Sequence, residues 1–117
     1  MVGMMRRGEI WIANLNPNKG GEIGKLRPVL ILQDDAMIAS GLPTFLIAPL
    51  TSQFRPALAP LRIPITPRDR LKSASYVMAE QLHAIDRSRF GEGPLATVSA
   101  EEMAAVEKSL RGVMGLW

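Results

Sequence analysis

The sequence contains no cysteine and a single histidine, His83. The absence of cysteine excludes disulfides, thiolate zinc sites and cysteine nucleophiles. One histidine excludes metal sites with several histidines and catalytic pairs of histidines. No stretch approaches the roughly 20 apolar residues needed to span a bilayer, and Met1–Arg7 lacks the order of charge and apolar core that marks a secretory signal. We therefore expect a cytoplasmic protein that does not insert into membranes.

The 117 residues are 47% hydrophobic and 21% charged, which excludes a disordered chain and predicts one domain over residues 1–117. The net charge of +3 allows an anionic partner without proving one. The basic surplus is uneven. Between Gln53 and Lys72, five basic residues face the single acid Asp69, whereas acids outnumber bases from Gly91 to Trp117. A polyanion would be drawn to the middle of the chain, although scattered, solvated arginines explain the count equally well.

Apolar patterns predict several short strands. Gly8–Asn14 alternates like a half-buried strand, with Trp11 on the less apolar face. Arg27–Gln33 and Thr44–Leu50 are near-continuous apolar runs, typical of strands covered on both faces, and Pro49 predicts a strand end or a sheet edge there. No crossover helix fits between these runs, which argues against a doubly wound nucleotide-binding fold.

Further along the chain, the patterns are shorter. Asp34–Ser40 is either one helical turn or a loop, and Arg62–Thr66 is a short strand interrupted by proline. Tyr76–Ala79 and Gln81–Ile85 are one irregular strand or two short ones. These features predict a mainly β fold, a small antiparallel sheet or barrel.

The end of the chain predicts a helix. Ser99–Glu102 has the sequence of a capping box, and apolar residues follow at helical spacing, with Gly112 and Gly115 weakening the last turns. The apolar face would be Met103, Val106, Leu110, Val113 and Met114.

Candidate chemistry gathers around Arg27. Gly20–Arg27 is glycine-rich and could cradle a phosphate, but it lacks the ending of a P-loop, and a hairpin loop is the favoured interpretation. Pro28 biases Arg27 toward an extended backbone, so a buried strand could hold its guanidinium, a fork of donors suited to phosphate, in one place. A solvated arginine at a strand end is the alternative.

Three other places in the sequence carry polar side chains of interest. The hydroxyls of Thr51–Gln53 could bond the local backbone or donate to a phosphate beside Arg27. His83 is the one side chain whose ordinary pKa is near neutrality, and hence an obvious acid or base, but a core or surface histidine is the commoner case. Asp86–Arg89 could be a charged turn alone.

Taken together, these segments resemble the MazF/PemK family, the toxin half of bacterial type II toxin–antitoxin pairs. The resemblance runs in order along nearly the whole chain, through Arg7–Trp11, Leu15–Pro17, Gly21–Glu22, Arg27–Leu32, Ile47–Ser52 and Glu80–Arg89, and ends with the C-terminal helix.

The resemblance implies an SH3-like β-barrel with a C-terminal helix, working as a homodimer. It implies an endoribonuclease that needs no metal or other cofactor and cuts single-stranded RNA, including mRNA, at short motifs, so that translation and growth stop. It also implies a cognate antitoxin whose acidic segment covers the RNA-binding groove, and no DNA substrate.

The family motif places Arg27 and Thr51 at catalytic positions and Glu22 at an acidic position in the loop after the first strand. RNA-binding positions implied by the resemblance are Lys25, Ser52, Gln53, Gln81, His83 and Asp86. Many relatives carry Arg-Thr where this chain has His83-Ala84. The loss of a fixed charge and a hydroxyl would change which bases are read or give His83 a role of its own.

The residues support cleavage by the RNA 2′-hydroxyl, with Arg27 stabilising charge on the phosphate and Thr51 donating to it. The base for the 2′-hydroxyl stays open between Glu22, His83 and water. Aromatic residues make up only 5% of the chain, so hydrogen bonds must supply much of any base specificity.

Two other functions compete with the nuclease. A poison of DNA gyrase resembling CcdB would use a C-terminal protein-binding surface, which the terminal Trp117 suggests, although a tryptophan packed on the helix or at a dimer interface is simpler. An inactive member of the family would bind RNA or antitoxin only.

Overall fold

The computed structural model describes residues 5–16 and 25–117. The mainly β prediction is confirmed, with helical elements that are short apart from the last one. The order along the chain is β1 (Glu9–Asn14), β2 (Leu26–Ile31), α1 (Asp35–Ala39), β3 (Thr44–Thr51), η1 (Pro56–Leu61), β4 (Arg62–Ile65), β5 (Ser75–Met78), η2 (Ala79–Gln81), β6 (His83–Asp86), η3 (Arg87–Arg89), β7 (Ala96–Thr97) and α2 (Ala100–Met114), where η marks a 3-10 turn.

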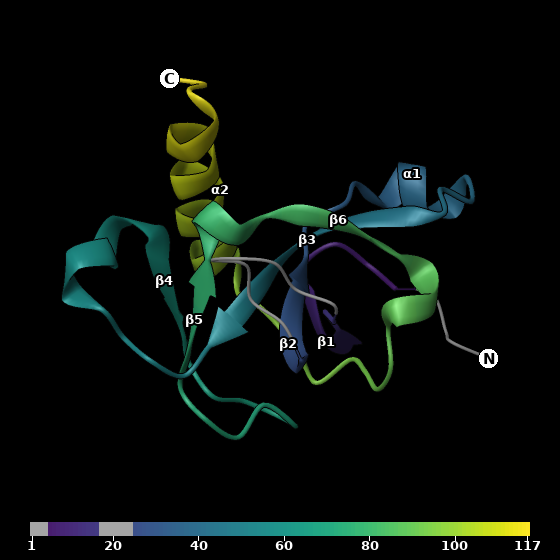
Figure 1. Cartoon of the computed structure of the whole chain (residues 1–117), viewed down its shortest axis with the longest axis horizontal. Helices are drawn as coiled ribbons and strands as arrows, with labels where there is room; N and C mark the ends of the chain where they lie inside the picture. The colour runs from purple at the N-terminus through teal and green to yellow at the C-terminus, as the bar shows by residue number, and fades with distance from the viewer. Residues whose placement is uncertain (1–4, 17–24) are drawn as a thin grey trace.

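The strands form an antiparallel sheet in the order β4-β5-β3-β2-β1-β7, with β6 also paired to β3. The sheet curls into a half-barrel, with α2 standing beside the β4–β5 end and α1 at the upper right, near β6 and the start of β3 (Figure 1). Among the residues described, no helix has the length and apolar character to cross a membrane.

Strand β3 is the centre of the sheet, and Pro49 lies inside it. The prediction that Pro49 marks a strand end or an edge is wrong, because the residue is fully buried and pairs with Val29 of β2. On its other side, β3 pairs with β6 up to Ile47 and with β5 from Leu50. Pro49 thus lies where β3 changes partners from β6 to β5, an irregular point in the pairing of the kind at which a sheet tolerates proline.

The two faces of the sheet are both covered. Ile10 and Leu30 belong to the core beneath α2, whereas Trp11 and Val29 belong to a second core on the opposite face. Trp11 is only 4% exposed, so the prediction of a half-buried first strand is wrong. Trp11 is buried because Phe90, which is distant in sequence, packs against it in the second core.

The predicted alternatives in the shorter segments are resolved. Asp34 caps α1 by accepting from two backbone amides, so this segment is a helical turn. Residues 75–86 form two strands, β5 and β6, separated by η2. That turn lets the two strands pair with different halves of β3, and it brings Gln81 to the same region as the end of β3.

Helix α2 begins at the predicted capping box, with Ser99 Oγ accepting from the Glu102 amide at 3.0 Å. Val106 and Leu110 are buried in the first core. Val113 and Met114 are exposed, because the helix extends past that core. The helix ends at Gly115, which adopts φ of 71°, a left-handed conformation suited to glycine.

Candidate active site

Arg27 and Thr51 meet at the ends of two neighbouring strands. The antiparallel register pairs Val29 of β2 with Pro49 of β3, and continuing it by two residues places Arg27 opposite Thr51. Opposite residues of an antiparallel pair project from the same face of a sheet. Both residues line the same cavities, so the two predicted catalytic side chains are brought together.

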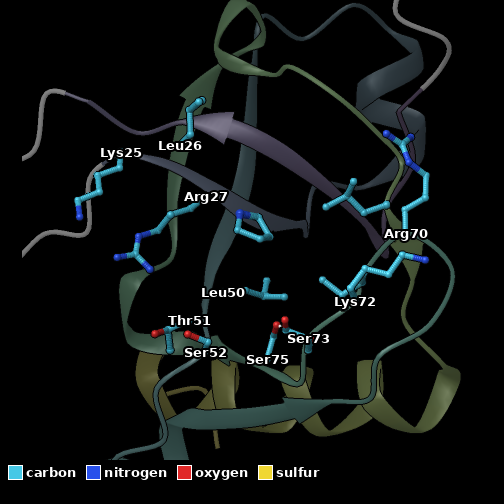
Figure 2. A pocket seen from close by; sticks show the side chains of 13 residues that line it. Lys25, Leu26, Arg27, Leu50, Thr51, Ser52, Arg70, Lys72, Ser73 and Ser75 are labelled. Atoms are coloured by element: carbon cyan, nitrogen blue, oxygen red, sulfur yellow. The ribbon is translucent and has the colours of Figure 1, made fainter.

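The first cavity has a volume of about 400 Å³ and lies beside these strand ends. Figure 2 shows the Arg27 guanidinium on one side, near the Thr51 and Ser52 hydroxyls, and Arg70 and Lys72 on the other. Its lining is Lys25, Leu26, Arg27, Pro28, Leu50, Thr51, Ser52, Arg70, Leu71, Lys72, Ser73, Ser75 and Leu95. Of the residues that the structure describes, four cations and no acid line this cavity, which makes it attractive to an anion.

A second cavity of about 310 Å³ shares Arg27, Thr51 and Ser52 with the first. Its other lining residues are Gln53, Arg55, Arg62, Met78 and Gln81. Two amide side chains and three guanidiniums give this side many hydrogen-bonding groups, whereas the first cavity combines cations with apolar walls. Arg27 and Thr51, the predicted catalytic pair, therefore lie between two spaces of different chemistry.

A buried ion pair supports the second cavity. Arg62 is 7% exposed and forms an ion pair with Glu80, the residue before Gln81 in η2. Among the described residues, the buried Arg62 Nε has no hydrogen-bond partner. A guanidinium removed from water needs its counter-charge, so this ion pair connects η2 to β4. It thereby holds the backbone of η2 from which the Gln81 side chain projects.

Lys25 is held at the rim by its backbone. Its φ is 73°, which is uncommon for a residue with a side chain. Its amide donates to Asn16 Oδ1 at 2.8 Å, and its carbonyl accepts from the Leu15 amide at 2.8 Å. These bonds join the end of β1 to the start of β2 and set the direction in which Lys25 enters the cavity.

Of the predicted RNA-binding residues, Lys25, Ser52, Gln53 and Gln81 line one cavity or both. His83 and Asp86 are not among the lining residues. His83 pairs with Ile47 of β3 and Asp86 with Thr44, about 13 and 23 Å along the strand from Thr51 at 3.3 Å per residue. Their roles in RNA binding stay predictions.

His83 and Asp86 have local partners. The exposed His83 ring has its Nδ1 2.7 Å from the Gln81 carbonyl. Asp86 caps η3, accepting from the Ser88 amide at 2.8 Å and the Ser88 hydroxyl at 2.5 Å. The Ser88 hydroxyl and amide lower the pKa of this carboxyl. Glu22, the predicted acidic residue, lies outside the described residues.

Sequence interpretation assigned no role to Arg55, Arg62, Arg70, Lys72 or Ser73, which also line the cavities. The basic surplus between Gln53 and Lys72 was the one feature of the sequence that pointed to these residues. It could not distinguish residues that line a cavity from residues that form structural ion pairs. Arg68 belongs to the same surplus and lies in neither cavity lining.

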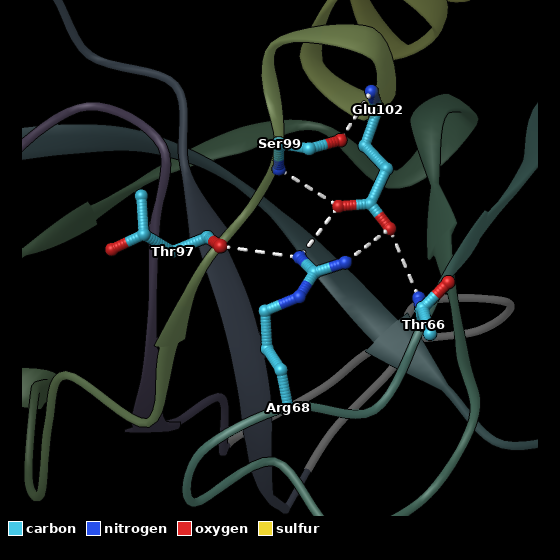
Figure 3. Close-up of polar contacts among 5 residues, drawn as sticks. All are labelled: Thr66, Arg68, Thr97, Ser99 and Glu102. Carbon is cyan, nitrogen blue, oxygen red and sulfur yellow. Dashed lines mark hydrogen bonds and ion pairs between the residues drawn. The ribbon is translucent and has the colours of Figure 1, made fainter.

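Arg68 binds the start of α2 (Figure 3). Its two terminal nitrogens donate to the Glu102 carboxylate at 2.6 and 2.9 Å, and one also donates to the Thr97 carbonyl at 3.1 Å. Backbone amides of Ser99 and Thr66 donate to the same carboxylate at 2.8 and 3.0 Å. Burial raises the pKa of Glu102, but these donors outweigh it and lower the pKa to about 2. The hydrogen bonds to the Glu102 carboxylate raise the pKa of Arg68.

No three histidine, aspartate or glutamate side chains come together as a metal-binding group within residues 5–16 and 25–117. The cavity linings themselves offer hydrogen bonding and positive charge directed at an anion, centred on Arg27 and Thr51.

Three comparisons relate this fold and site to known proteins. Residues 6–114 match the family described as PemK-like, MazF-like toxin of type II toxin–antitoxin system. The chain is 32% identical over 114 residues to "Endoribonuclease MazF" of Staphylococcus saprophyticus, covering 97% of this chain and 93% of that protein. The match thus spans almost the whole of both proteins.

Solved structures agree in fold. A MazF structure from Deinococcus radiodurans superposes with a TM-score of 0.82 at 25% identity, covering 96% of this chain and 97% of the other. A mycobacterial endoribonuclease, solved in complex with its cognate antitoxin, superposes with a TM-score of 0.74 at 20% identity, covering 99% and 98%. The resemblance noted in the sequence is confirmed, and the chain belongs to the PemK-like, MazF-like family of type II toxins.

Proposed function

We propose that the protein is an endoribonuclease toxin that cleaves single-stranded RNA at short motifs and thereby inhibits translation and growth. The observation that carries the proposal is that Arg27 and Thr51, at the ends of two neighbouring strands, line the same two cavities, among cations and amides. The relative named as an endoribonuclease covers 97% of the chain, which supports the same reaction class.

In the proposed reaction, the RNA supplies its own nucleophile. The 2′-oxygen forms a bond to phosphorus, the bond from phosphorus to the 5′-oxygen breaks, and the products are a 2′,3′-cyclic phosphate and a 5′-hydroxyl. The 2′-hydroxyl proton leaves to a base, and the departing 5′-oxygen gains a proton. No metal ion or other cofactor is required, since the protein has only to orient the phosphate and stabilise its charge.

Arg27 stabilises the charge that develops on the non-bridging phosphate oxygens, and Thr51 donates a hydrogen bond to the same group. An arginine stays protonated near neutrality, so Arg27 does not act as the base. The register places His83 about 13 Å along β3 from Thr51, which argues against direct proton transfer by His83. Glu22 and water remain as the base.

Base recognition belongs to the second cavity in this proposal. Gln53 and Gln81 carry both donors and acceptors, as reading the edge of an unstacked base requires. The buried pair of Arg62 and Glu80 holds the turn that carries Gln81. His83 and Asp86, which lie along β6, would contact RNA beyond the cavities.

The same cationic surface suits an acidic inhibitor. A mycobacterial relative was solved in complex with its cognate antitoxin. We propose a cognate antitoxin whose acidic segment covers the cavities, and a homodimer that acts in the cytoplasm. DNA lacks the 2′-hydroxyl that the reaction consumes, so DNA is not a substrate.

One incubation tests the proposed function. Purified protein is mixed with mixed-sequence RNA and EDTA, and the fragment ends are mapped. Fragments with 5′-hydroxyl and 2′,3′-cyclic phosphate ends are expected, and the map gives the motif. A second RNA with a 2′-deoxy nucleotide at the mapped site should resist cleavage there; cutting at that site would exclude attack by the 2′-oxygen. Intact RNA together with inhibition of gyrase would support a CcdB-like poison instead, and the absence of both effects would support an inactive family member.

A further inference from the structure

The first cavity has two cationic sides, and the proposed chemistry uses only one. Lys25 and Arg27 lie on the side of the catalytic threonine, while Arg70 and Lys72 lie across the cavity (Figure 2). Leu50 lies between them, with Ser75 close by. A space of about 400 Å³ therefore separates two groups of positive charge.

The turn that carries Arg70 and Lys72 is fixed by backbone bonds. Arg68 and Leu71 exchange backbone hydrogen bonds at 3.0 and 2.9 Å, and the Arg70 amide donates to the Leu95 carbonyl at 2.9 Å. Leu71 is buried between the two basic residues. Because the backbone is anchored on both sides, the two side chains are presented at a defined place on the rim.

The partners of these two cations can be exchanged for a phosphate. Arg70 donates to Glu92 at 2.7 Å, but the two side chains are 54% and 74% exposed, and such surface pairs contribute little. The Lys72 ammonium donates to the neutral carbonyl of Asp69 at 2.8 Å. Of the described residues, no carboxylate forms an ion pair with Lys72.

We propose that Arg70 and Lys72 form a second phosphate site, which binds the phosphate next to the scissile one in single-stranded RNA. This inference rests on the proposed endoribonuclease function and adds a subsite to it. The nucleotide between the two phosphates occupies the cavity above Leu50. Contacts to phosphate fix the register of the strand without reading its sequence, so the pair positions RNA and leaves the motif unchanged.

The first test compares variants that remove equal charge inside and outside the cavity. Arg70→Ala with Lys72→Ala is the cavity variant, and Lys108→Ala with Arg111→Ala, both on α2, is the matched control. The cavity variant should raise KM for the mapped RNA about tenfold, as removal of a charge-assisted hydrogen bond does. Its kcat should stay within about twofold of the wild type, because the interaction is not specific to the transition state.

Salt dependence gives an independent readout. Binding of a 2′-O-methyl RNA of the mapped motif, which cannot cyclise, is measured at increasing salt. The slope of log affinity against log salt should fall by about 0.7 for each phosphate of the single strand that the protein no longer neutralises. The cavity variant should show the smaller slope, and the α2 control should keep that of the wild type. Equal slopes in all three proteins would overturn the proposal.

The decisive experiment neutralises one phosphate at a time with methylphosphonate in the same non-cleavable RNA. The wild type should lose affinity when the phosphate beside the scissile one is neutralised, and the cavity variant should show no further loss at that position, since coupled groups are non-additive. Equal losses in both proteins would overturn the second phosphate site.

The two proposals fail in different ways. If the wild type cleaves RNA and the cavity variant matches the α2 control in KM, slope and methylphosphonate response, the subsite is wrong and the nuclease stands. If the wild type neither cleaves nor binds RNA, both are wrong. If the cavity variant loses affinity only for an acidic peptide, such as a glutamate-rich 20-mer, the pair serves a protein partner and the RNA subsite is overturned.

Discussion

Arg68 and Arg70 are two residues apart in sequence and have opposite surroundings. Arg68 forms a two-pronged ion pair with Glu102 at the start of α2, where the side chains are 28% and 12% exposed. Arg70 forms a single contact with Glu92, where the side chains are 54% and 74% exposed. One pair fastens the start of the helix to the loop after β4, and the other lies on the rim of a cationic cavity.

The comparison shows that a basic surplus in a sequence mixes two populations. Arg62 and Arg68 are neutralised by the partly buried carboxylates of Glu80 and Glu102, and these pairs hold the fold together, although Arg62 also lines the second cavity. Arg55 and Lys72 line cavities and, within the described residues, have no carboxylate partner. Charge that is available to a polyanion is therefore smaller than the sequence count, and it is concentrated around Arg27.

Among substitutions of cavity-lining and structural residues, we expect the largest effect from Arg27→Ala, which removes a cavity cation. Loss of a preorganised donor to the reacting phosphate should reduce cleavage by about a hundredfold or more, with the free energy of unfolding nearly unchanged. Initial rates on the mapped RNA and urea unfolding measure the two quantities. Arg111→Ala on α2 is the matched control. Normal cleavage by folded Arg27→Ala would remove this residue from the mechanism.

Glu80→Gln probes the buried structural pair. It leaves the Arg62 guanidinium, 7% exposed, without its counter-charge. Loss of one partner of a fully buried pair costs about 3–5 kcal/mol, and because Glu80 is partly exposed we expect the free energy of unfolding to fall by about 2 kcal/mol. Urea denaturation measures it, with the exposed Glu101→Gln on α2 as control. An unchanged midpoint would contradict the structural role of the pair.

Glu102→Gln tests the pair at the start of α2. It keeps the shape of the side chain but removes the charge facing Arg68, and it should lower the free energy of unfolding by about 1 kcal/mol at neutral pH.

The pH dependence of this site follows from its pKa. The folded-state pKa of Glu102 is about 2, below the ordinary 4.5. Its contribution to stability is therefore fully present above pH 4.5 and declines as the pH falls toward 2. The stability difference between the wild type and Glu102→Gln should shrink over this range, as chemical denaturation at several pH values can measure. A constant difference would show that the charge does not act through this pKa.

Glu92→Ala should have the smallest effect. It removes the exposed partner of Arg70, so the free energy of unfolding should change by about 0.5 kcal/mol or less. Because an acid near the cationic rim is removed, affinity for RNA should rise slightly, as titration at low salt can detect. A loss of stability as large as that of Glu102→Gln would remove the distinction between the two pairs.

Sequence patterns predicted most of the strands and the capping box well, because each depends on neighbouring residues. The catalytic roles of Arg27 and Thr51 came from the family resemblance and stay predictions. Val106 and Leu110 follow the helical period, and the Arg27-Pro28 step marks the start of a buried strand. The environments of Trp11 and Pro49 were missed. Both depend on what covers the sheet or pairs with it from distant parts of the chain.

Local sequence was enough to establish the family, the mainly β fold with its capped helix, and the placement of an arginine and a threonine at strand ends. Only the sheet register decided that these two strand ends adjoin. Which cations face a cavity and which pair with carboxylates follows from the three-dimensional arrangement of the chain. Charge is fixed by residue type, but its availability depends on burial and on partners that lie far away in the chain, such as Glu102, which is 34 residues from Arg68. For that reason, the phosphate-binding surface that we propose lies only where the fold leaves cations beside Arg27.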